Sequence, residues 1–216
     1  LLASVLLFLL LFDVIAVSPS AQAQKLTPWW TAFGHVKPYV WKLAAITLSY
    51  VFVVEALTAF LPTFLREGGA TRWSANISLS VYQVAGVAGA FLGGVLGDRF
   101  GRKRMLLVAF ITLPGLLLLF LASSGWASVL TIIGLGLMGL TITPNLMALG
   151  QETYPDHRAM VNGMYMGINF VGQSLAAFLL GAIGDIFGLR TAFAFAALLP
   201  FLALPVILQL PGRREG

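Results

Sequence analysis

The chain has 216 residues, of which 59% are apolar and 10% are charged. A soluble domain carries about a quarter charged residues, so 13 basic and 8 acidic side chains are too few to cover a surface in water. A surface that faces lipid needs no charge. The composition therefore predicts an integral membrane protein and excludes an ordinary soluble domain.

The composition also limits the chemistry of the chain. It contains no cysteine, which excludes disulfides and thiolate metal sites. We expect both histidines, His35 and His157, to lie in loops, and neither has a second ligand at metal-binding spacing, so we predict no metal site. The net charge of +5 comes from basic residues in short segments between apolar runs. This distribution favours orientation in a membrane over binding of nucleic acid.

Residues 1–17 form the first apolar run, and the sequence begins inside it without a methionine. We predict that the run is the end of a truncated transmembrane helix and that the sequence is a fragment. A signal peptide is the competing interpretation, because small residues follow the run as they do at a cleavage site. The run lacks a charged start, however, and Asp13 interrupts it. Cleavage would also place the basic loops outside the cell, so we favour the truncated helix.

Residues 18–42 form the longest connection between apolar runs. They contain Pro19, Pro28 and three tryptophans together with lysines, a content typical of a segment at a membrane interface. We predict a linker here. Six complete apolar runs follow, each near the roughly 20 residues that a helix needs to cross a bilayer. They lie near 43–65, 75–97, 104–122, 127–150, 160–184 and 190–210.

These runs predict an all-α, polytopic transmembrane bundle over residues 43–210, followed by a short tail, 211–216. When the loops are assigned alternately to the two sides, one side receives only Arg66, Arg72 and Arg190. The other side receives ten basic residues: Lys25, Lys37, Lys42, Arg99, Arg102, Lys103, Arg104, Arg158, Arg213 and Arg214. The positive-inside rule makes this side the cytoplasm. We therefore predict a multi-pass protein of a bacterial inner membrane, with residues 18–42 and the C-terminus in the cytoplasm.

An internal repeat relates two of the runs. Residues 90–101, AFLGGVLGDRFG, match residues 177–188, AFLLGAIGDIFG, at eight of twelve positions. The offset covers three runs, an odd number, so the two copies lie on opposite sides of the membrane. Three-helix units repeated with inverted topology are a recurrent plan of secondary transporters.

The most specific stretch is Gly94-Val-Leu-Gly-Asp98-Arg99-Phe-Gly101-Arg102-Lys103-Arg104. Its glycines permit a tight turn between two helices, and Asp98 can pair with Arg99 or Arg102. A plain cytoplasmic loop explains the cations but not the acid and the spaced glycines.

This stretch resembles, at every position, the loop signature of the major facilitator superfamily, G-x-x-x-D-R-x-G-R-[RK]-[RK]. In that family the signature follows helices 2 and 8, and a cytoplasmic linker joins two six-helix halves. The resemblance implies that residues 1–17 are helix 6 and that the six complete runs are helices 7–12, the C-terminal half of a twelve-helix fold with 3+3 inverted repeats. Residues 151–158 resemble the loop between helices 10 and 11. Residues 60–62 are similar to drug-efflux members of the fosmidomycin-resistance type.

The resemblance also implies a role for five signature residues, Gly94, Asp98, Arg99, Gly101 and Arg102. They would form a cytoplasmic latch that helps to set the equilibrium between inward-open and outward-open states. Because such a latch acts through different contacts in two conformations, we expect it to affect turnover more than substrate choice. Its partner helix would belong to the missing N-terminal half of the chain.

Polar side chains within the runs are candidates for a substrate pathway, since they usually face a bundle interior or an aqueous cavity. At 100° per residue, one face of run 160–184 carries Asn162, Met166, Asn169 and Gln173, and another face carries Gly163, Gly167, Ser174 and Gly181. The small face indicates helix packing. The amide face either lines a cavity or bonds to a neighbouring helix. Run 75–97 repeats the scheme, with Asn76, Ser80 and Gln83 on one face and Gly86, Gly89, Gly93 and Gly97 on another.

Two further positions complete the predicted pathway. Pro144 removes a backbone donor beside Asn145, and a loosened helix next to a polar side chain is typical of a transporter site, although such kinks also occur without a ligand. Glu55 is the only acid within a complete run. Because low-dielectric surroundings disfavour a charged carboxylate, we hypothesise that Glu55 exchanges protons and couples them to transport, or receives a cationic substrate. A neutral or paired structural glutamate is the alternative.

These features predict a secondary active transporter that moves a small organic solute by alternating access, with proton-coupled efflux as the first choice. Proton-coupled uptake of a small metabolite and a transporter-like sensor without flux are the alternatives. An enzyme is not expected, because no histidine, cysteine or lysine accompanies Glu55 inside the membrane. We expect a proton gradient in place of a cofactor. The expected partners are the lipid bilayer, a small-molecule substrate and the missing half of the chain, and not nucleic acid.

Overall fold

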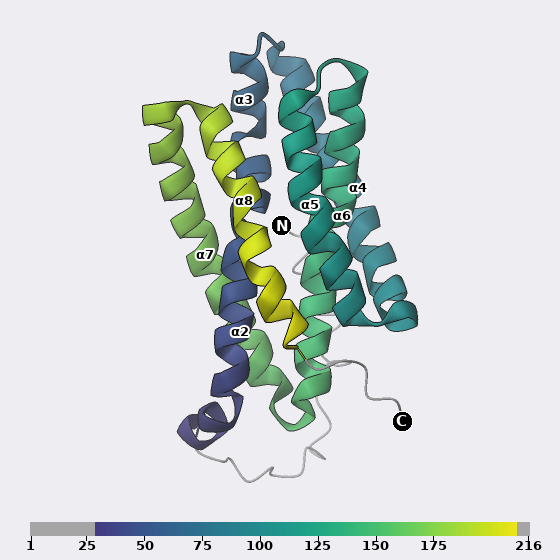
Figure 1. The fold of residues 1–216 in the computed structure, drawn as a ribbon, viewed down its shortest axis with the longest axis vertical. Helices are drawn as coiled ribbons and strands as arrows, with labels where there is room; N and C mark the ends of the chain where they lie inside the picture. Colours follow the sequence, from purple (N-terminus) through teal and green to yellow (C-terminus); the bar gives the residue numbers. More distant parts are fainter. Residues whose placement is uncertain (1–28, 211–216) are drawn as a thin grey trace, which may run out of the picture. The chain divides into compact units, whose positions relative to one another are not determined.

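The computed structural model describes residues 29–210 (Figure 1). The predicted helix at 1–17, the first part of the predicted linker and the tail at 211–216 lie outside the described residues. The chain divides into two compact units, Leu1–His35 and Val36–Gly216. The six predicted spans all belong to the second unit, and the structure below is that of this unit.

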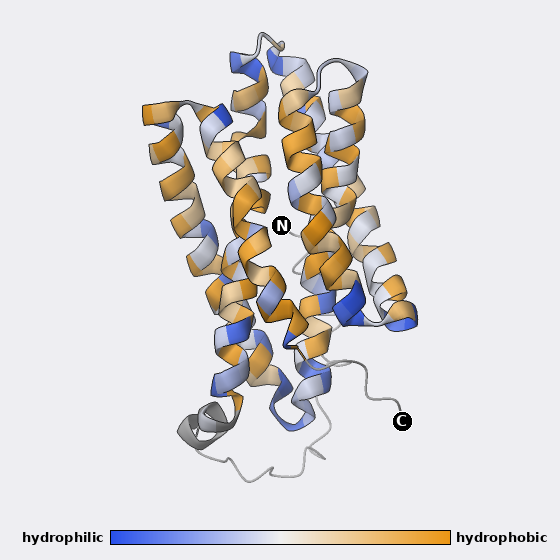
Figure 2. Cartoon of the chain, in the orientation of Figure 1, coloured by the Kyte–Doolittle hydropathy of each residue, from blue (hydrophilic) through white to orange (hydrophobic). Residues whose placement is uncertain are grey.

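The described residues are helical throughout, with short turns between the helices and no strand. In chain order the elements are α2 (Trp29–Glu55), the π-helical turn η1 (Ala56–Phe60), α3 (Leu61–Glu67), α4 (Arg72–Phe100), α5 (Arg102–Ala122), α6 (Trp126–Thr153), the 3-10 turn η2 (Pro155–His157), α7 (Arg158–Phe187) and α8 (Leu189–Leu208). They make 6 helical stretches that are long and apolar enough to cross a membrane, the first running from Val36 through η1 to Glu67. Figure 2 shows hydrophobic residues along these stretches and hydrophilic residues near their ends. The predicted all-α bundle with six membrane-spanning helices is confirmed.

The first helix begins earlier than predicted. Helix α2 starts at Trp29, inside the predicted linker, so that His35 lies in a helix rather than in a loop. Val36, Tyr39 and Leu43 are all buried. They recur at three- and four-residue intervals, so they continue one buried helical face to positions before the start of the apolar run. A boundary drawn from the loss of continuous apolar residues misses this face.

The tightest helix pair is α4 with α6, and the glycine face predicted for α4 forms it. A methyl group added at Gly89 would lie 2.1 Å from the backbone oxygen of Leu137, and one at Gly93 would lie 2.5 Å from Thr141 Cγ2. Thr141 donates its hydroxyl hydrogen to the Gly89 carbonyl at 2.8 Å. Glycine therefore permits an approach of two backbones that any side chain would prevent.

The glycine face predicted for α7 behaves differently. A methyl group at Gly163 or Gly167 would meet no atom of the described residues, and one at Gly181 would touch only Phe60, at 3.7 Å. The glycines of α7 that pack closely are Gly172, against Leu48 on α2, and Gly184, against Leu189 on α8. For Gly163 and Gly167 the predicted helix packing stays a prediction, because no atom of the described residues covers them.

The inverted repeat has the same backbone geometry in both copies. Gly101 joins α4 to α5 with a φ of 96°, and Gly188 joins α7 to α8 with a φ of 85°. Each donates its N–H to the residue four positions earlier, to Gly97 at 3.0 Å and to Gly184 at 2.9 Å. Figure 1 shows the two turns at opposite ends of the helices. The repeated sequence thus folds into the same helix–turn–helix twice, with opposite orientation.

Candidate functional site

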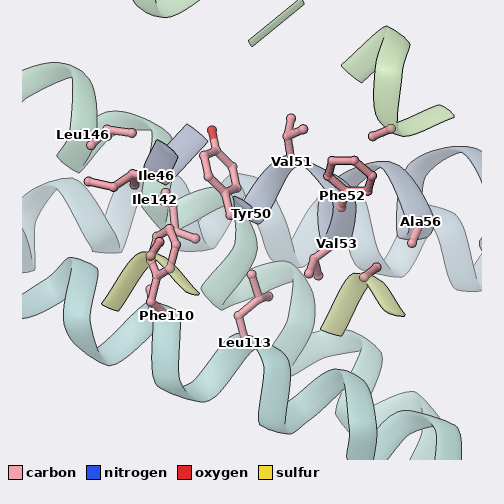
Figure 3. Close-up of a cluster of buried hydrophobic side chains, with 14 of the residues drawn as sticks. Ile46, Tyr50, Val51, Phe52, Val53, Ala56, Phe110, Leu113, Ile142 and Leu146 are labelled. Atoms are coloured by element: carbon pink, nitrogen blue, oxygen red, sulfur yellow. The ribbon is translucent and has the colours of Figure 1, made fainter. Parts of the chain in front are cut away.

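The site begins at Tyr50 on α2, whose ring belongs to the buried core. The ring contacts Phe110 on α5 edge-on, with centroids 6.1 Å apart and an interplanar angle of 73°. Figure 3 shows the Tyr50 hydroxyl pointing away from Phe110 and Leu113. The ring thus anchors the residue in apolar surroundings while its oxygen reaches the polar side chains of α6 and α7.

Three hydroxyl groups from three helices meet at this point. The hydroxyl oxygens of Tyr50 and Tyr165, from α2 and α7, lie 2.7 Å apart. Tyr165 donates to Thr143 Oγ1 of α6 at 3.1 Å, and the Tyr50 and Thr143 oxygens are 3.3 Å apart. Buried hydroxyl groups are costly without partners. Here each hydroxyl satisfies another, which fixes the relative positions of α2, α6 and α7.

Two amides extend the hydroxyl groups along α7. Asn169 donates from Nδ2 to the Tyr50 hydroxyl at 3.2 Å, and Gln173 donates from Nε2 to Asn169 Oδ1 at 2.7 Å. Tyr165, Asn169 and Gln173 follow one another at four-residue intervals, so they lie on one helical face. We call Tyr50, Thr143, Tyr165, Asn169 and Gln173 the hydroxyl–amide cluster.

The hydroxyl–amide cluster lines a cavity of about 180 Å³. The remaining wall is mostly apolar and consists of Val51, Val54, Gly139, Leu140, Met166 and Phe170. A few convergent polar groups in a mainly apolar cavity are typical of a small-molecule site. The structure thus brings two of the predicted pathway residues, Asn169 and Gln173, to one cavity wall.

Glu55 lies on the same helix as Tyr50 but outside the cavity lining. It is half-buried and immediately precedes the π-helical turn Ala56–Phe60. Such turns interrupt α-helices most often at functional sites. Among the described residues it makes no hydrogen bond or ion pair.

Three other predicted pathway residues lie away from the cavity. Gln83 is exposed on α4. Asn145 is fully buried between α4 and α6, where its Nδ2 donates to the carbonyl oxygens of Gly93 and Thr141, both at 2.9 Å. Asn162, near the start of α7, accepts from Gln151 Nε2 at 3.0 Å. The helix also continues unbroken past Pro144, so in this structure Asn145 serves helix packing.

The predicted latch residues converge on Arg102 at the α4–α5 turn. Its guanidinium donates to Asp98 Oδ1 from Nη2 and to Glu152 Oε1 from Nε, both at 2.6 Å. Arg102, one of the two predicted partners of Asp98, thus binds it. Arg99 lies over the ring of Phe100, with Cζ 5.6 Å from the centroid. The signature thus joins the ends of α4 and α6.

The same turn also holds the end of α8. Lys103 donates from Nζ to the carbonyl oxygens of Leu208 and Leu210, at 2.6 and 2.8 Å, and Lys42 donates to the Gln209 carbonyl at 3.1 Å. The last carbonyls of a helix have no intrahelical partner, and lysine ammonium groups satisfy them well. The basic residues at this end therefore fix helix ends within the bundle as well as orienting it.

Sequence reasoning missed four of these residues: Tyr50, Thr143, Tyr165 and Glu152. Tyr165 had a detectable signal, because it precedes Asn169 by four residues, as Asn169 precedes Gln173. Glu152 ends α6 next to the predicted loop between helices 10 and 11, and its partner lies 50 residues away in sequence. Tyr50 carried no periodic signal, since it sits in a continuous apolar run.

Six membrane-spanning helices that contain an inverted repeat follow a plan that recurs in secondary transporters. Residues 43–215 match the family model for the Major Facilitator Superfamily. The chain belongs to the Major Facilitator Superfamily.

Relatives and solved structures agree with this assignment. The chain is 29% identical to the fosmidomycin resistance protein of Escherichia coli over 80% of this chain and 43% of that protein. It is also 29% identical to a 4-hydroxybenzoate transporter of Pseudomonas aeruginosa, over 82% and 41% respectively. The crystal structure of the transporter FucP in the outward conformation has the same fold, with a TM-score of 0.78 at 18% identity over 97% of this chain and 52% of that one. The chain thus spans less than half the length of these two relatives.

Proposed function

We propose that the chain is the C-terminal half of a secondary active transporter that moves a small organic solute by alternating access. The observation that carries this proposal is the cavity at the hydroxyl–amide cluster. It lies between α2, α6 and α7 of a six-helix unit whose family plan has two such units. The names of these relatives agree with transport rather than catalysis.

The faces of α4 and α7 supply the second line of support. Only 22% of the apolar stretch of α4 and 17% of that of α7 is buried within this bundle, against 56% of the first span. Large apolar side chains are exposed there, among them Val84, Val87 and Phe91 on α4 and Phe170, Val171 and Phe178 on α7. We propose that these faces contact the N-terminal half. The open space at Gly163 and Gly167 on α7 suits the close approach of another helix.

Glu55 is the proposed proton carrier of this half. It is the one acidic side chain within the described spans that lies away from a span end, and it immediately precedes the π-helical turn. A carboxyl group in such surroundings binds and releases a proton as its exposure to water changes. Protonation of Glu55 would accompany the passage between the two access states.

Efflux is the proposed direction, from the similarity to the fosmidomycin resistance protein. Uptake is the second candidate, because two other relatives are named as transporters of aromatic acids, 4-hydroxybenzoate and gallate. The proposed location is a bacterial inner membrane. One E. coli relative is named as an inner membrane transport protein. The α4–α5 turn would then face the cytoplasm.

Three charged side chains at the α4–α5 turn form the proposed latch. Asp98, Arg102 and Glu152 tie the ends of α4 and α6 together. A contact that differs in strength between two conformations shifts their populations. We propose that this set biases the inward–outward equilibrium and thereby sets turnover.

Flux into proteoliposomes tests the proposal. The full-length protein is reconstituted, a pH gradient is imposed, and the movement of fosmidomycin and of 4-hydroxybenzoate is followed with each gradient direction. We expect gradient-driven flux of at least one solute, and we expect Glu55→Gln to abolish its dependence on the gradient. Glu67→Gln, at the exposed end of α3, is the matched control and keeps that dependence. Binding of a solute without any flux supports the sensor instead.

A further inference from the structure

We infer that the hydroxyl–amide cluster takes a single aromatic ring that carries a hydroxyl group, with no charge at the end that enters the cavity. This inference rests on the proposed function and specifies the chemistry of the substrate. It follows from the size of the cavity, its apolar wall, the direction of its hydrogen bonds and its charges.

The size of the cavity limits the ligand to one ring. Its volume is about 180 Å³. Cavities of about 150 Å³ engineered in other proteins hold benzene, whereas drug-sized ligands occupy pockets of about 300–1,000 Å³. The part of a ligand that enters this half of the cavity therefore matches a single ring in size.

The apolar wall suits the faces of such a ring. Val51 and Val54 line the cavity from α2, Leu140 from α6, and Phe170 from α7. Phe170 is exposed on the side where this bundle ends. An aromatic ring between aliphatic side chains and Phe170 gains both apolar burial and an aromatic contact.

The hydrogen bonds of the cluster leave one group free, at its Gln173 end. Donation passes from Gln173 to Asn169, from Asn169 to Tyr50, between the hydroxyls of Tyr50 and Tyr165, and from Tyr165 to Thr143. Within the described residues, the Gln173 carbonyl oxygen receives no hydrogen bond. A hydroxyl group on the ligand is the simplest partner for it, because it donates one hydrogen and fits beside a small ring.

The charges around the cavity disfavour an anionic group. All five cluster residues are neutral, and the basic side chains of the described residues lie toward the ends of the spans. The nearest ionisable group on α2 is Glu55, one turn from Val51. A carboxylate placed here would lose its hydration without gaining a cation. The charged end of an aromatic acid is therefore directed out of this cavity, toward the other half.

The test compares three ligands that differ in one group each: 4-hydroxybenzoate, benzoate and 4-hydroxybenzamide. Their binding to the full-length protein in lipid nanodiscs is measured by isothermal titration calorimetry. We expect 4-hydroxybenzoate to bind about tenfold more tightly than benzoate, as one well-formed hydrogen bond allows. In Gln173→Leu this preference disappears while benzoate binding is retained. Gln173→Leu weakens the binding of 4-hydroxybenzamide by the same factor as that of 4-hydroxybenzoate, because the cluster does not contact the charged end of the ligand.

Two further variants complete the design. Thr143→Val alters the other end of the hydrogen-bonded chain and reduces the same preference. Gln209→Leu removes an exposed amide at the end of α8 and leaves the preference for 4-hydroxybenzoate over benzoate unchanged. Retained benzoate binding shows that each variant is folded.

The inference is overturned if the parent protein shows no preference for the hydroxyl group, or if Gln173→Leu weakens benzoate and 4-hydroxybenzoate equally. It is also overturned if none of the three ligands binds while flux of another solute is present, an outcome that leaves the proposed transport function intact. Binding with the expected preference but no flux of any solute has the opposite meaning. It supports the cluster chemistry and contradicts the transporter.

Discussion

The hydroxyl oxygens of Tyr50 and Tyr165 lie 2.7 Å apart, although 115 residues separate them in the sequence. This contact joins α2 to α7, and Thr143 brings α6 to the same point. The polar cavity is therefore held by the same hydrogen bonds that position its helices. A change in the cavity and a change in helix position are linked at this contact.

Tyr165→Phe tests that link. The variant removes the hydroxyl that bridges Tyr50 and Thr143, and we expect it to lower the free energy of unfolding by about 0.5–1.5 kcal/mol. Thermal unfolding in detergent measures the change, and solute binding should weaken in parallel. Tyr154→Phe is the control, because no hydrogen bond of the Tyr154 hydroxyl is found in the described residues. Equal stability of the two variants would show that the Tyr50–Tyr165 contact holds nothing in place.

The approach of α4 to α6 predicts a severe effect of a single methyl group. In Gly89→Ala the new Cβ would lie 2.1 Å from the Leu137 backbone oxygen, and backbone cannot rotate away as a side chain can. We expect a loss of about 3 kcal/mol, at the upper end of ordinary overpacking. Gly115→Ala, at a helical position with no atom within 4 Å, should be neutral or stabilising. The thermal unfolding midpoints of the two variants measure the difference, and similar midpoints would contradict the close approach of α4 to α6.

The burial of Asn145 predicts a structural rather than a ligand-binding role in this half. Asn145→Leu loses two hydrogen bonds, to the backbone carbonyls of Gly93 and Thr141. We expect a loss of stability of about 1 kcal/mol, since such bonds are worth roughly 0.6 kcal/mol each within membranes. Solute affinity of the folded fraction should not change. A lower affinity with normal stability would return Asn145 to the pathway.

The latch predicts an effect on rate rather than on affinity. Arg102→Lys keeps the charge but loses the planar guanidinium that binds Asp98 and Glu152 at once. The carboxylates of these ion pairs are exposed, so we expect the free-energy difference between the two conformations to change by about 1 kcal/mol at most. This change is equivalent to a several-fold change in turnover. Arg104→Gln, an exposed neighbour outside the latch, is the control. A changed Kd with unchanged turnover would argue against a conformational role.

The fold was largely predictable because its signals are local. Apolar runs of the right length predict the six spans, and the repeated Gly-Asp-x-Phe-Gly predicts the two matching turns at Gly101 and Gly188. The start of α2 was not predictable from the apolar run, since Val36 and Tyr39 continue its buried face among polar neighbours. The helix that covers Gly163 and Gly167 was not predictable, because spacing alone does not show which helix covers a face.

The candidate site was predictable only in part, for a related reason. Asn169 and Gln173 stand out as amides on one face of a transmembrane helix. The partners of Tyr50 lie 93 residues away or more, those of Thr143 lie 93 and 22 residues away, and that of Glu152 lies 50 residues away. A single sequence contains no record of such pairs. Asn145 shows the converse, because a buried amide that bonds to a neighbouring helix has the same sequence pattern as one that faces a cavity.

The central claim is that the hydroxyl–amide cluster faces a pathway open alternately to the two sides of the membrane. Residues 1–216 contain no cysteine, so Gln173→Cys introduces the one thiol of this half on the cavity wall, and Leu202→Cys places one on an exposed apolar surface as a control. Modification by a membrane-impermeant maleimide is measured from each side in turn, with and without a pH gradient. We predict that Gln173→Cys reacts from both sides, and that the gradient raises one rate while lowering the other. Reaction from neither side, or from one side at a rate that the gradient does not change, would contradict alternating access at this cavity.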